Sequence, residues 1–142
     1  MKISTRGRYG LKAVIDIAVH STENCITLKS ISARQGISEN YLEQLITPIK
    51  KAGFVESTRG PQGGYKLSKD AKEISVGDIL RVLEGSLYPS DCISDDEAAK
   101  LCNQGSCHNC VTKSVWEKIY NSLNDVLESI TLQDLVNDYK NM

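Results

Sequence analysis

The sequence has no long apolar run and no secretory signal. None of its 142 residues lie in a stretch that approaches the roughly 18 apolar residues of a membrane span. The basic start, MKISTRGRYG, is not followed by an uninterrupted apolar segment. Internal repeats and low-complexity segments are absent as well. We therefore expect a cytoplasmic protein with no membrane partner, in a compartment that keeps thiols reduced.

Disulfides are not needed to hold such a chain together. A sequence of 142 residues that is 40% hydrophobic can bury a core of its own, as one domain or as one domain with an arm. The five cysteines therefore indicate metal binding or redox chemistry before they indicate structural cross-links.

Charge is distributed unevenly, although the net charge is only -1. Residues 1–72 carry twelve Lys or Arg and six Asp or Glu, whereas residues 73–142 carry five and twelve. A basic half suits a polyanion, of which nucleic acid is the commonest. A solvated surface with uneven charge is the alternative.

Three helices are predicted in the front part of the chain. Apolar residues recur at helical spacing over about 8–21, Thr27 can cap a short second helix that Gly36 ends, and Ser38 can cap a third. Pro48 either kinks the third helix or restarts it, and the sequence leaves both open.

A hairpin and three further elements follow. Strands are predicted in FVEST and YKLS, joined by the glycine-rich turn RGPQGG, and Ser75 can cap the helix VGDILRVLEG. Residues 86–112 are predicted to be a loop, residues 113–130 a long amphipathic helix, and Thr131 the cap of a last short helix. The long helix would span about 27 Å. Its apolar stripe is too long for so small a domain to cover, which favours a partner copy over a stripe that folds back.

The expected fold is mainly α with a small β-hairpin: a winged helix-turn-helix followed by a long C-terminal dimerisation helix. We expect residues 1–84 to form the DNA-binding domain and residues 85–112 a cysteine-rich cofactor loop. Residues 113–142 would then hold the dimerisation helix and a short terminal helix.

The helix after the turn GIS has the position of a recognition helix, which enters the major groove of DNA. Its polar residues match the hydrogen-bonding code of that groove, since Glu43 can accept from cytosine while Asn40 and Gln44 can pair with adenine. A polar face that is merely solvated is the alternative, and Ser38 has a sufficient role as an N-cap.

The hairpin turn offers a second contact. Arg59 stands at the mouth of the turn, where it can enter a minor groove of negative potential. A tight turn that happens to contain an arginine is the alternative. Glycines that would supply positive φ beside phosphate are Gly60, Gly63 and Gly64. Basic residues suited to phosphate contacts are Arg6, Arg8, Lys50 and Lys51.

Four of the five cysteines have the spacing Cys92-x9-Cys102-x4-Cys107-x2-Cys110. Four thiolates can bind zinc or an iron-sulfur cluster. Structural zinc sites usually have two C-x2-C pairs and only one is present here, which favours a two-iron, two-sulfur (2Fe-2S) cluster. Zinc, and a thiol switch without any cofactor, remain alternatives. Cys25, between two predicted helices, is expected to be a small buried residue.

The stretches MKISTRGRYGLKAVIDIA, ISENYLEQLITPIKKAGFVES and RGPQGGYKL, with the later SVWEKI and ITLQDL, resemble the IscR/CymR family of bacterial winged-helix transcription factors. The resemblance covers nearly the whole chain. It implies a homodimer that binds partly palindromic promoter DNA through the recognition helix and wing, with the long C-terminal helix at the dimer interface. The candidate DNA-binding residues are then Arg6, Arg8, Tyr9, Ser38, Asn40, Tyr41, Glu43, Gln44, Arg59, Gly60 and Pro61.

The same resemblance bears on the cysteines. The IscR branch holds a 2Fe-2S cluster through three cysteines and a histidine in this loop, whereas the CymR branch lacks the cysteine set. NCVTKSVW resembles the Cys-x-Thr-His-x-x-Trp pattern of the IscR branch, with Lys113 in the place of the histidine. Lysine is not an expected ligand, so we expect the extra cysteine to replace it. The predicted metal ligands are Cys92, Cys102, Cys107 and Cys110, with His108 as a possible substitute.

We therefore expect a DNA-binding transcription regulator, not an enzyme, that senses cluster or redox status. A cluster-free repressor of cysteine or sulfur metabolism, with a metabolic enzyme as partner, is the first alternative. A thiol or zinc switch, an electron carrier and a protein-binding winged helix are the others.

Overall fold

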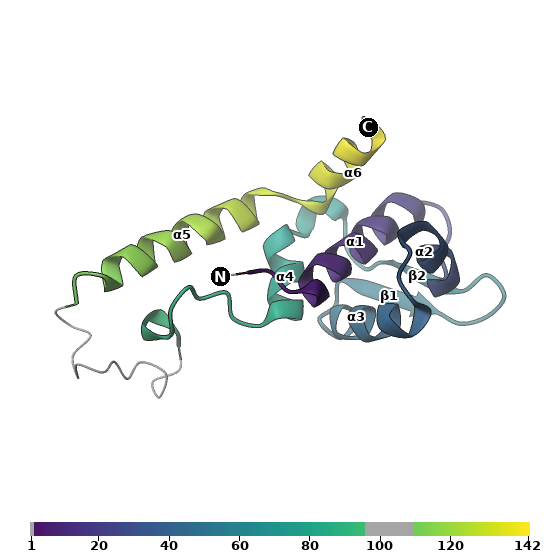
Figure 1. Ribbon diagram of the computed structural model, residues 1–142. Helices are drawn as coiled ribbons and strands as arrows, with labels where there is room; N and C mark the ends of the chain where they lie inside the picture. Colours follow the sequence, from purple (N-terminus) through teal and green to yellow (C-terminus); the bar gives the residue numbers. More distant parts are fainter. Residues whose placement is uncertain (1, 96–109) are drawn as a thin grey trace.

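The computed structural model describes residues 2–95 and 110–142. Within them the chain forms six α-helices, one two-stranded sheet and two 3₁₀ turns (Figure 1). In chain order these are α1 (Thr5–His20), α2 (Leu28–Gln35), α3 (Glu39–Lys51), β1 (Val55–Thr58), β2 (Gly64–Leu67), η1 (Ala71–Glu73), α4 (Val76–Glu84), η2 (Asp91–Ile93), α5 (Lys113–Ser129) and α6 (Leu132–Lys140). The expected winged helix-turn-helix and long C-terminal helix are confirmed.

Helices α2 and α3 form the helix-turn-helix, and local chemistry defines both starts. The Thr27 hydroxyl accepts from the backbone N–H of Ser30 at 3.1 Å, and the Ser38 hydroxyl accepts from that of Tyr41 at 3.2 Å. Gly36 ends α2 in the left-handed region at φ 67°. These caps satisfy backbone donors that would otherwise have no partner, as the sequence predicts.

The start of α1 differs from the prediction, and the role of Pro48 in α3, which the sequence left open, is decided. Helix α1 begins at Thr5, earlier than predicted, because the Ser4 hydroxyl caps it by accepting from the N–H of Gly7 at 3.2 Å. Pro48 lies inside a continuous α3 and does not restart it. The neighbouring Thr47 hydroxyl donates to the carbonyl of Glu43 at 2.6 Å.

A single apolar core joins α1, α2, α3 and α4 with the start of the hairpin and the start of α6. Its largest fully buried members are Val14, Ile17, Ile31, Leu42, Leu45, Ile46, Ile49, Val55, Ile74, Ile79 and Leu132. Asp16 is buried among them, where its carboxylate accepts from Arg34 and Gln35 of α2. This buried ion pair fixes α2 against α1. We call α1 to α4, the hairpin and α6 the head.

The wing is an antiparallel pair in which Val55 faces Leu67 and Thr58 faces Gly64. A third segment supports it, because Ile26 and Tyr65 exchange backbone hydrogen bonds of 2.9 and 2.7 Å. Cys25, beside this bridge, is only partly buried, so the expectation of a buried residue is wrong. Its partial exposure follows from its place at the edge of the wing.

The glycines of the turn have two different roles. Gly60 has φ 109°, which agrees with the prediction. Gly63 does not have positive φ, and there the prediction is wrong. A Cβ at position 63 would instead lie 2.1 Å from the carbonyl oxygen of Thr58, so glycine is required because the turn passes close to the end of β1.

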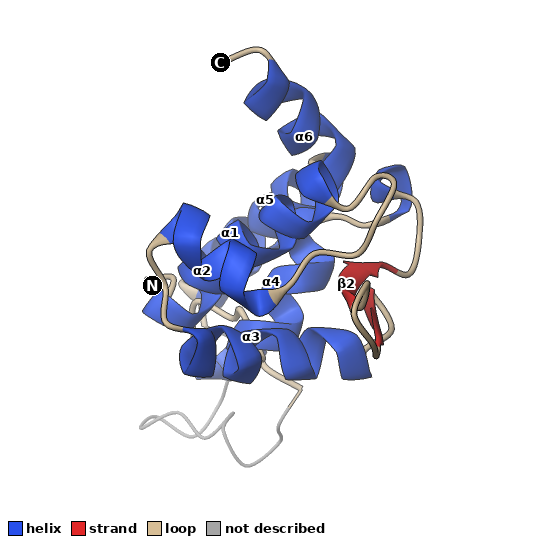
Figure 2. Cartoon of the chain, turned by 90° about the vertical axis from the view of Figure 1, so that its right-hand side faces the viewer, coloured by secondary structure: helices blue, strands red, loops and turns tan. Residues whose placement is uncertain are grey.

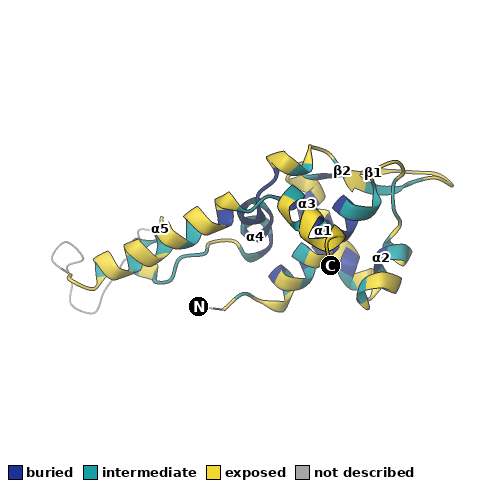
Figure 3. Cartoon of the chain, turned by 90° about the horizontal axis from the view of Figure 1, so that it is seen from above, coloured by how far each residue is buried: buried dark blue, intermediate teal, exposed yellow. Residues whose placement is uncertain are grey.

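Helix α5 extends away from the head, and α6 returns to pack on α1 (Figure 1). Only the C-terminal part of α5 is well covered. There Leu127 is buried with Val76 and Leu80 of α4 in a second, smaller apolar cluster. Figure 3 shows the exposed length of α5 beyond this contact. Among the described residues, no helix is long and apolar enough to cross a membrane.

Candidate DNA-binding surface and cysteine site

Helix α3 has one buried face and one polar exposed face. Leu42, Leu45, Ile46 and Ile49 are completely buried, which turns Asn40, Glu43 and Gln44 outward. The polar face is therefore fixed by the packing of the apolar one. This is the arrangement that a recognition helix needs to reach base edges.

A groove of 660 Å³ runs beside this face. Arg6, from the first turn of α1, lies in it together with the polar residues of α3, so two helices distant in sequence contribute to one surface. In the groove the cations Arg6 and Lys51 lie near side chains that donate and accept hydrogen bonds. Its lining residues are Arg6, Asn40, Glu43, Gln44, Thr47, Pro48 and Lys51.

Tyr9 and Tyr41 link α1 to α3 beside this groove. Their rings meet edge to face at 6.2 Å between centroids. The Lys12 ammonium group lies over the Tyr9 ring, 5.7 Å from its centroid. The Arg8 guanidinium lies 5.9 Å from the same centroid. Such cation–π contacts hold the two positive side chains near the start of α1. Tyr9 and Tyr41 are both only partly exposed, so each also has a packing role.

The wing contributes the remaining predicted contacts. Arg59, Gly60 and Pro61 are all exposed at the tip of the hairpin, and β1 contacts α3, so the wing stands next to the recognition helix (Figure 2). The tip is separate from the groove that Arg6 shares with α3. The groove and the wing tip are thus two separate parts of the candidate DNA-binding surface. Between them they hold Arg6, Asn40, Glu43, Gln44, Arg59, Gly60 and Pro61.

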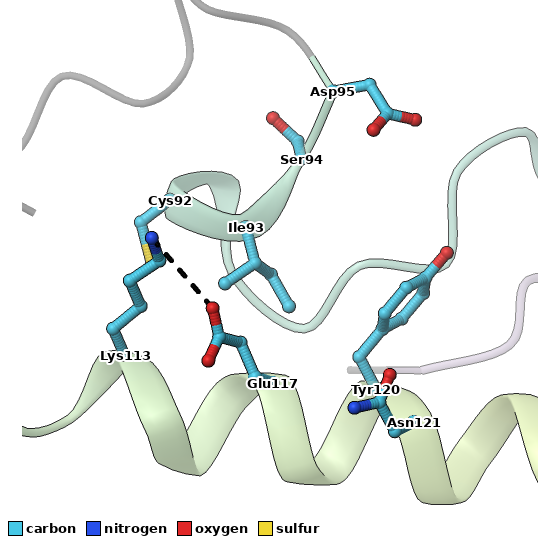
Figure 4. A pocket seen from close by; sticks show the side chains of 8 residues that line it. All are labelled: Cys92, Ile93, Ser94, Asp95, Lys113, Glu117, Tyr120 and Asn121. Atoms are coloured by element: carbon cyan, nitrogen blue, oxygen red, sulfur yellow. Dashed lines mark ion pairs between the residues drawn. The ribbon is translucent and has the colours of Figure 1, made fainter.

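Cys92 lies on the 3₁₀ turn η2, which packs on α5. A pocket of 410 Å³ lies between these two elements (Figure 4). The Cys92 Sγ is 3.2 Å from the Ser90 hydroxyl, and Lys113 forms an ion pair of 3.8 Å with Glu117 on the α5 side. The pocket is lined by Cys92, Ile93, Ser94, Asp95, Lys113, Glu117, Tyr120 and Asn121.

Cys110 is exposed just before the start of α5. A side-chain hydrogen bond from Thr112, at 3.1 Å between Sγ and Oγ1, lowers the pKa of the Cys110 thiol, and backbone N–H groups of Lys113 and Thr112 lower it further. Hydrogen bonds of this kind favour the thiolate, which is the form that binds metals.

The other two predicted ligands, Cys102 and Cys107, lie outside the described residues, as does His108. In residues 2–95 and 110–142 no three His, Cys, Asp or Glu side chains gather as a metal site. Of the predicted ligands, the two that are described nevertheless fit a metal group chemically, since Cys92 lines a pocket and Cys110 favours the thiolate. Lys113 itself forms an ion pair with Glu117.

Tyr88, just before η2, stacks against Tyr120 of α5, and this pair was not predicted. Their rings lie 4.6 Å apart, and the Tyr88 hydroxyl donates to Asp95 at 2.6 Å. That hydrogen bond, and a second one with Tyr120, raise the pKa of Tyr88, so it stays a neutral donor. The two tyrosines were detectable only as aromatic residues at the edges of a predicted loop and a predicted helix.

Comparisons with known proteins agree with this architecture. Residues 3–138 match the Rrf2 family model, described as an iron-dependent transcriptional regulator. The solved structure of T. potens IscR is 49% identical in sequence to this chain. The match covers 98% of this chain and 88% of the IscR chain, with a TM-score of 0.77. CymR, described as the global cysteine regulator of B. subtilis, is 42% identical over 96% of this chain and 97% of its own, with a TM-score of 0.78. IscR of Vibrio campbellii is 39% identical over 97% of this chain and 79% of its own length.

Proposed function

Because this chain belongs to the Rrf2 family of transcriptional regulators, we propose that it binds promoter DNA as a homodimer and that a 2Fe-2S cluster in its cysteine segment adjusts that binding. The observation that carries the DNA-binding part is the exposed polar face of α3 in one groove with Arg6. The chain is a regulator and not an enzyme.

In this proposal α3 lies in the major groove. Glu43 accepts from cytosine N4, while Asn40 and Gln44 pair with adenine, and each good pair contributes about 1–3 kcal/mol of discrimination. Arg59 at the wing tip enters the adjacent minor groove. Contacts that position the protein on phosphate without reading sequence come from Arg6, Arg8, Tyr9, Ser38, Tyr41, Gly60, Pro61, Lys50 and Lys51.

The homodimer forms along α5. Val115, Ile119 and Val126 are 45%, 37% and 55% exposed, and their spacing of four and seven residues places them on one stripe. The head does not cover this stripe. A second copy of α5 would cover it in the way that coiled-coil helices cover each other.

The cysteine site would take its ligands from the segment that includes η2 and from the residues just before α5. Cys92 on η2 and Cys110 before α5 would hold the cluster together with Cys102 and Cys107, and the bound cluster would supply a redox-sensitive link between these segments. Because η2 packs on α5, a change in the ligation of Cys92 acts directly on the proposed dimer helix. Zinc in the same four thiolates is the alternative cofactor.

Purification without air tests the cofactor. We expect a coloured protein with equal iron and sulfide, whose affinity for promoter DNA in a gel-shift assay changes when the cluster is removed. Replacing Cys92, Cys102, Cys107 and Cys110 by serine should abolish the colour and that change. The matched control is Cys25→Ser, which removes a thiol beside the wing and should keep the colour. A colourless wild-type protein with bound zinc would favour the zinc switch.

The second candidate is a cluster-free regulator of cysteine metabolism, and the likeness to a structure described as a cysteine regulator favours it. In that case a metabolic enzyme would be the partner. The four-serine variant distinguishes the two, because it would leave regulation unchanged in a cluster-free protein and would remove the response to iron in a cluster sensor.

A further inference from the structure

Arg81 of α4 holds two successive turns of α5. Its guanidinium forms an ion pair with Glu128, and its Nη2 donates to Asn124 Oδ1 at 2.9 Å. Residues 124 and 128 lie one turn apart on the same face of α5. The planar guanidinium therefore fixes the direction of α5 at two points, which the single ammonium group of a lysine would not reproduce. We call Arg81, Asn124 and Glu128 the Arg81 joint.

The two helices pack tightly at this joint. A Cβ on Gly77 of α4 would lie 3.0 Å from Glu128 Oε1 and 3.1 Å from the Cβ of Leu127, so a larger residue there would require these side chains to shift. The hydroxyl of Ser75, which caps α4, also donates to Glu128 Oε2 at 3.4 Å. Glu128 thus contacts α4 both at its N-cap and at Arg81.

Backbone hydrogen bonds fix the same end of α5. The N–H of Val76 donates to the carbonyl of Ile130 at 2.8 Å, and the N–H of Leu132 donates to that of Ile74 at 2.9 Å. These bonds hold the chain where α5 ends but not the angle at which the helix leaves the head. That angle depends on the side chains of the Arg81 joint and on the small apolar cluster around Leu127.

A small rotation at this point has a large effect at the other end. Helix α5 has 17 residues. At 1.5 Å per residue it is about 25 Å long, so a rotation of about 10° displaces its N-terminal end by about 4 Å. One step along DNA is about 3.4 Å. In a dimer paired along α5, a rotation of this size would therefore change the distance between the two heads by about one base pair.

We propose that the Arg81 joint determines the half-site spacing that the homodimer prefers. The inference rests on the proposed homodimer and on its binding to paired half-sites. None of the three residues lines the DNA-binding groove, so each is a positioning residue that acts through α5. A change in the Arg81 joint would leave the contacts of one head with a single half-site unchanged. It would alter which distances between two half-sites the dimer can bind.

In vitro selection from a random double-stranded DNA library tests the proposal with the full chain. Wild type, Arg81→Met and the matched control Lys140→Met, which removes one cation from the exposed end of α6, would be compared. For wild type and K140M we expect one dominant spacing between inverted half-sites. For R81M we expect the preference for that spacing over neighbours one base pair away to fall by at least about fivefold. Affinity for a single half-site and the dimer measured by sedimentation should stay unchanged.

Two further variants make the result decisive. Glu128→Gln keeps the shape of the side chain and loses the ion pair, and should broaden the spacing in the same direction if R81M does not fold. The exchange of charges in Arg81→Glu with Glu128→Arg should recover part of the preference. An unchanged spacing profile in R81M and E128Q would overturn the proposal, as would an equal loss of affinity at every spacing. If the wild type selects no paired half-sites, the proposed homodimeric function itself fails, and this inference fails with it.

Discussion

Leu45 in α3 and Val126 in α5 are both apolar helix residues, but the first is completely buried and the second is 55% exposed. This difference in exposure distinguishes the head from α5. The head closes its own core around α3, whereas the stripe on α5 remains open to another molecule. The head therefore buries its core within a single chain, whereas the stripe on α5 is not covered by the described residues of that chain.

The largest effect should come from the closed region. Leu45→Ala leaves a cavity in the core and should lower the free energy of unfolding by about 2–5 kcal/mol, measured by urea denaturation. The loss should not depend on protein concentration. The control Glu43→Ala lies on the exposed face of the same helix and should change stability by less than about 0.5 kcal/mol. Equal losses in both variants would mean that α3 is not packed as described.

The open region should respond differently. Ile119→Asp places a charge in the α5 stripe and should weaken the homodimer by about 100-fold or more, measured by sedimentation, because burial of an unpaired carboxylate is costly. The melting of the head should hardly change. Asn121→Asp adds the same charge on the side of α5 that lines the cysteine pocket, and should leave the dimer intact. Dimerisation that survives I119D would place the interface elsewhere.

The polar face of the head permits a finer comparison. Glu43→Ala should relax specificity at one base pair and cost about 1–3 kcal/mol on the preferred sequence. Lys51→Ala should instead weaken binding to all sequences alike and reduce the slope of log affinity against log salt by about 0.9. Fluorescence anisotropy at several salt concentrations separates the two. A uniform effect of E43A would show that this residue does not read bases.

The smallest effect concerns the thiol beside the free end of α5. Thr112→Val removes the hydrogen bond that lowers the pKa of Cys110, so the thiolate fraction at neutral pH should fall and alkylation of Cys110 should slow. The rate profile should shift to higher pH. Thr112→Ser keeps the hydroxyl and should keep the rate. Mass spectrometry of the reduced, cofactor-free protein measures each site, and equal rates in all three proteins would contradict this role of Thr112.

Features that depend on neighbouring residues could be predicted from the sequence. The caps at Thr27, Ser38, Ser75 and Thr131 are all present, because each hydroxyl satisfies a backbone donor within three residues. The exposed polar face of α3 followed from its apolar spacing in the same way. The dimer, the DNA contacts and the cluster ligands stay predictions.

Features that depend on distant partners could not be predicted. The start of α1 was placed too late, because the Ser4 cap was not recognised. The reason for glycine at positions 7 and 10 was also hidden, since it is close contact with Glu84 and Leu83 of α4. The pairing of Asp16 with Arg34 was missed as well. An acidic residue in the middle of the apolar stripe of α1 was the one available sign of it.

The core of the head is completed by Leu132, which is fully buried although it follows both the cysteine segment and α5 in the chain. During synthesis the ribosome therefore releases the thiols before the residue that closes the core. A chain still being translated therefore exposes these thiols before the head has received its last core residue.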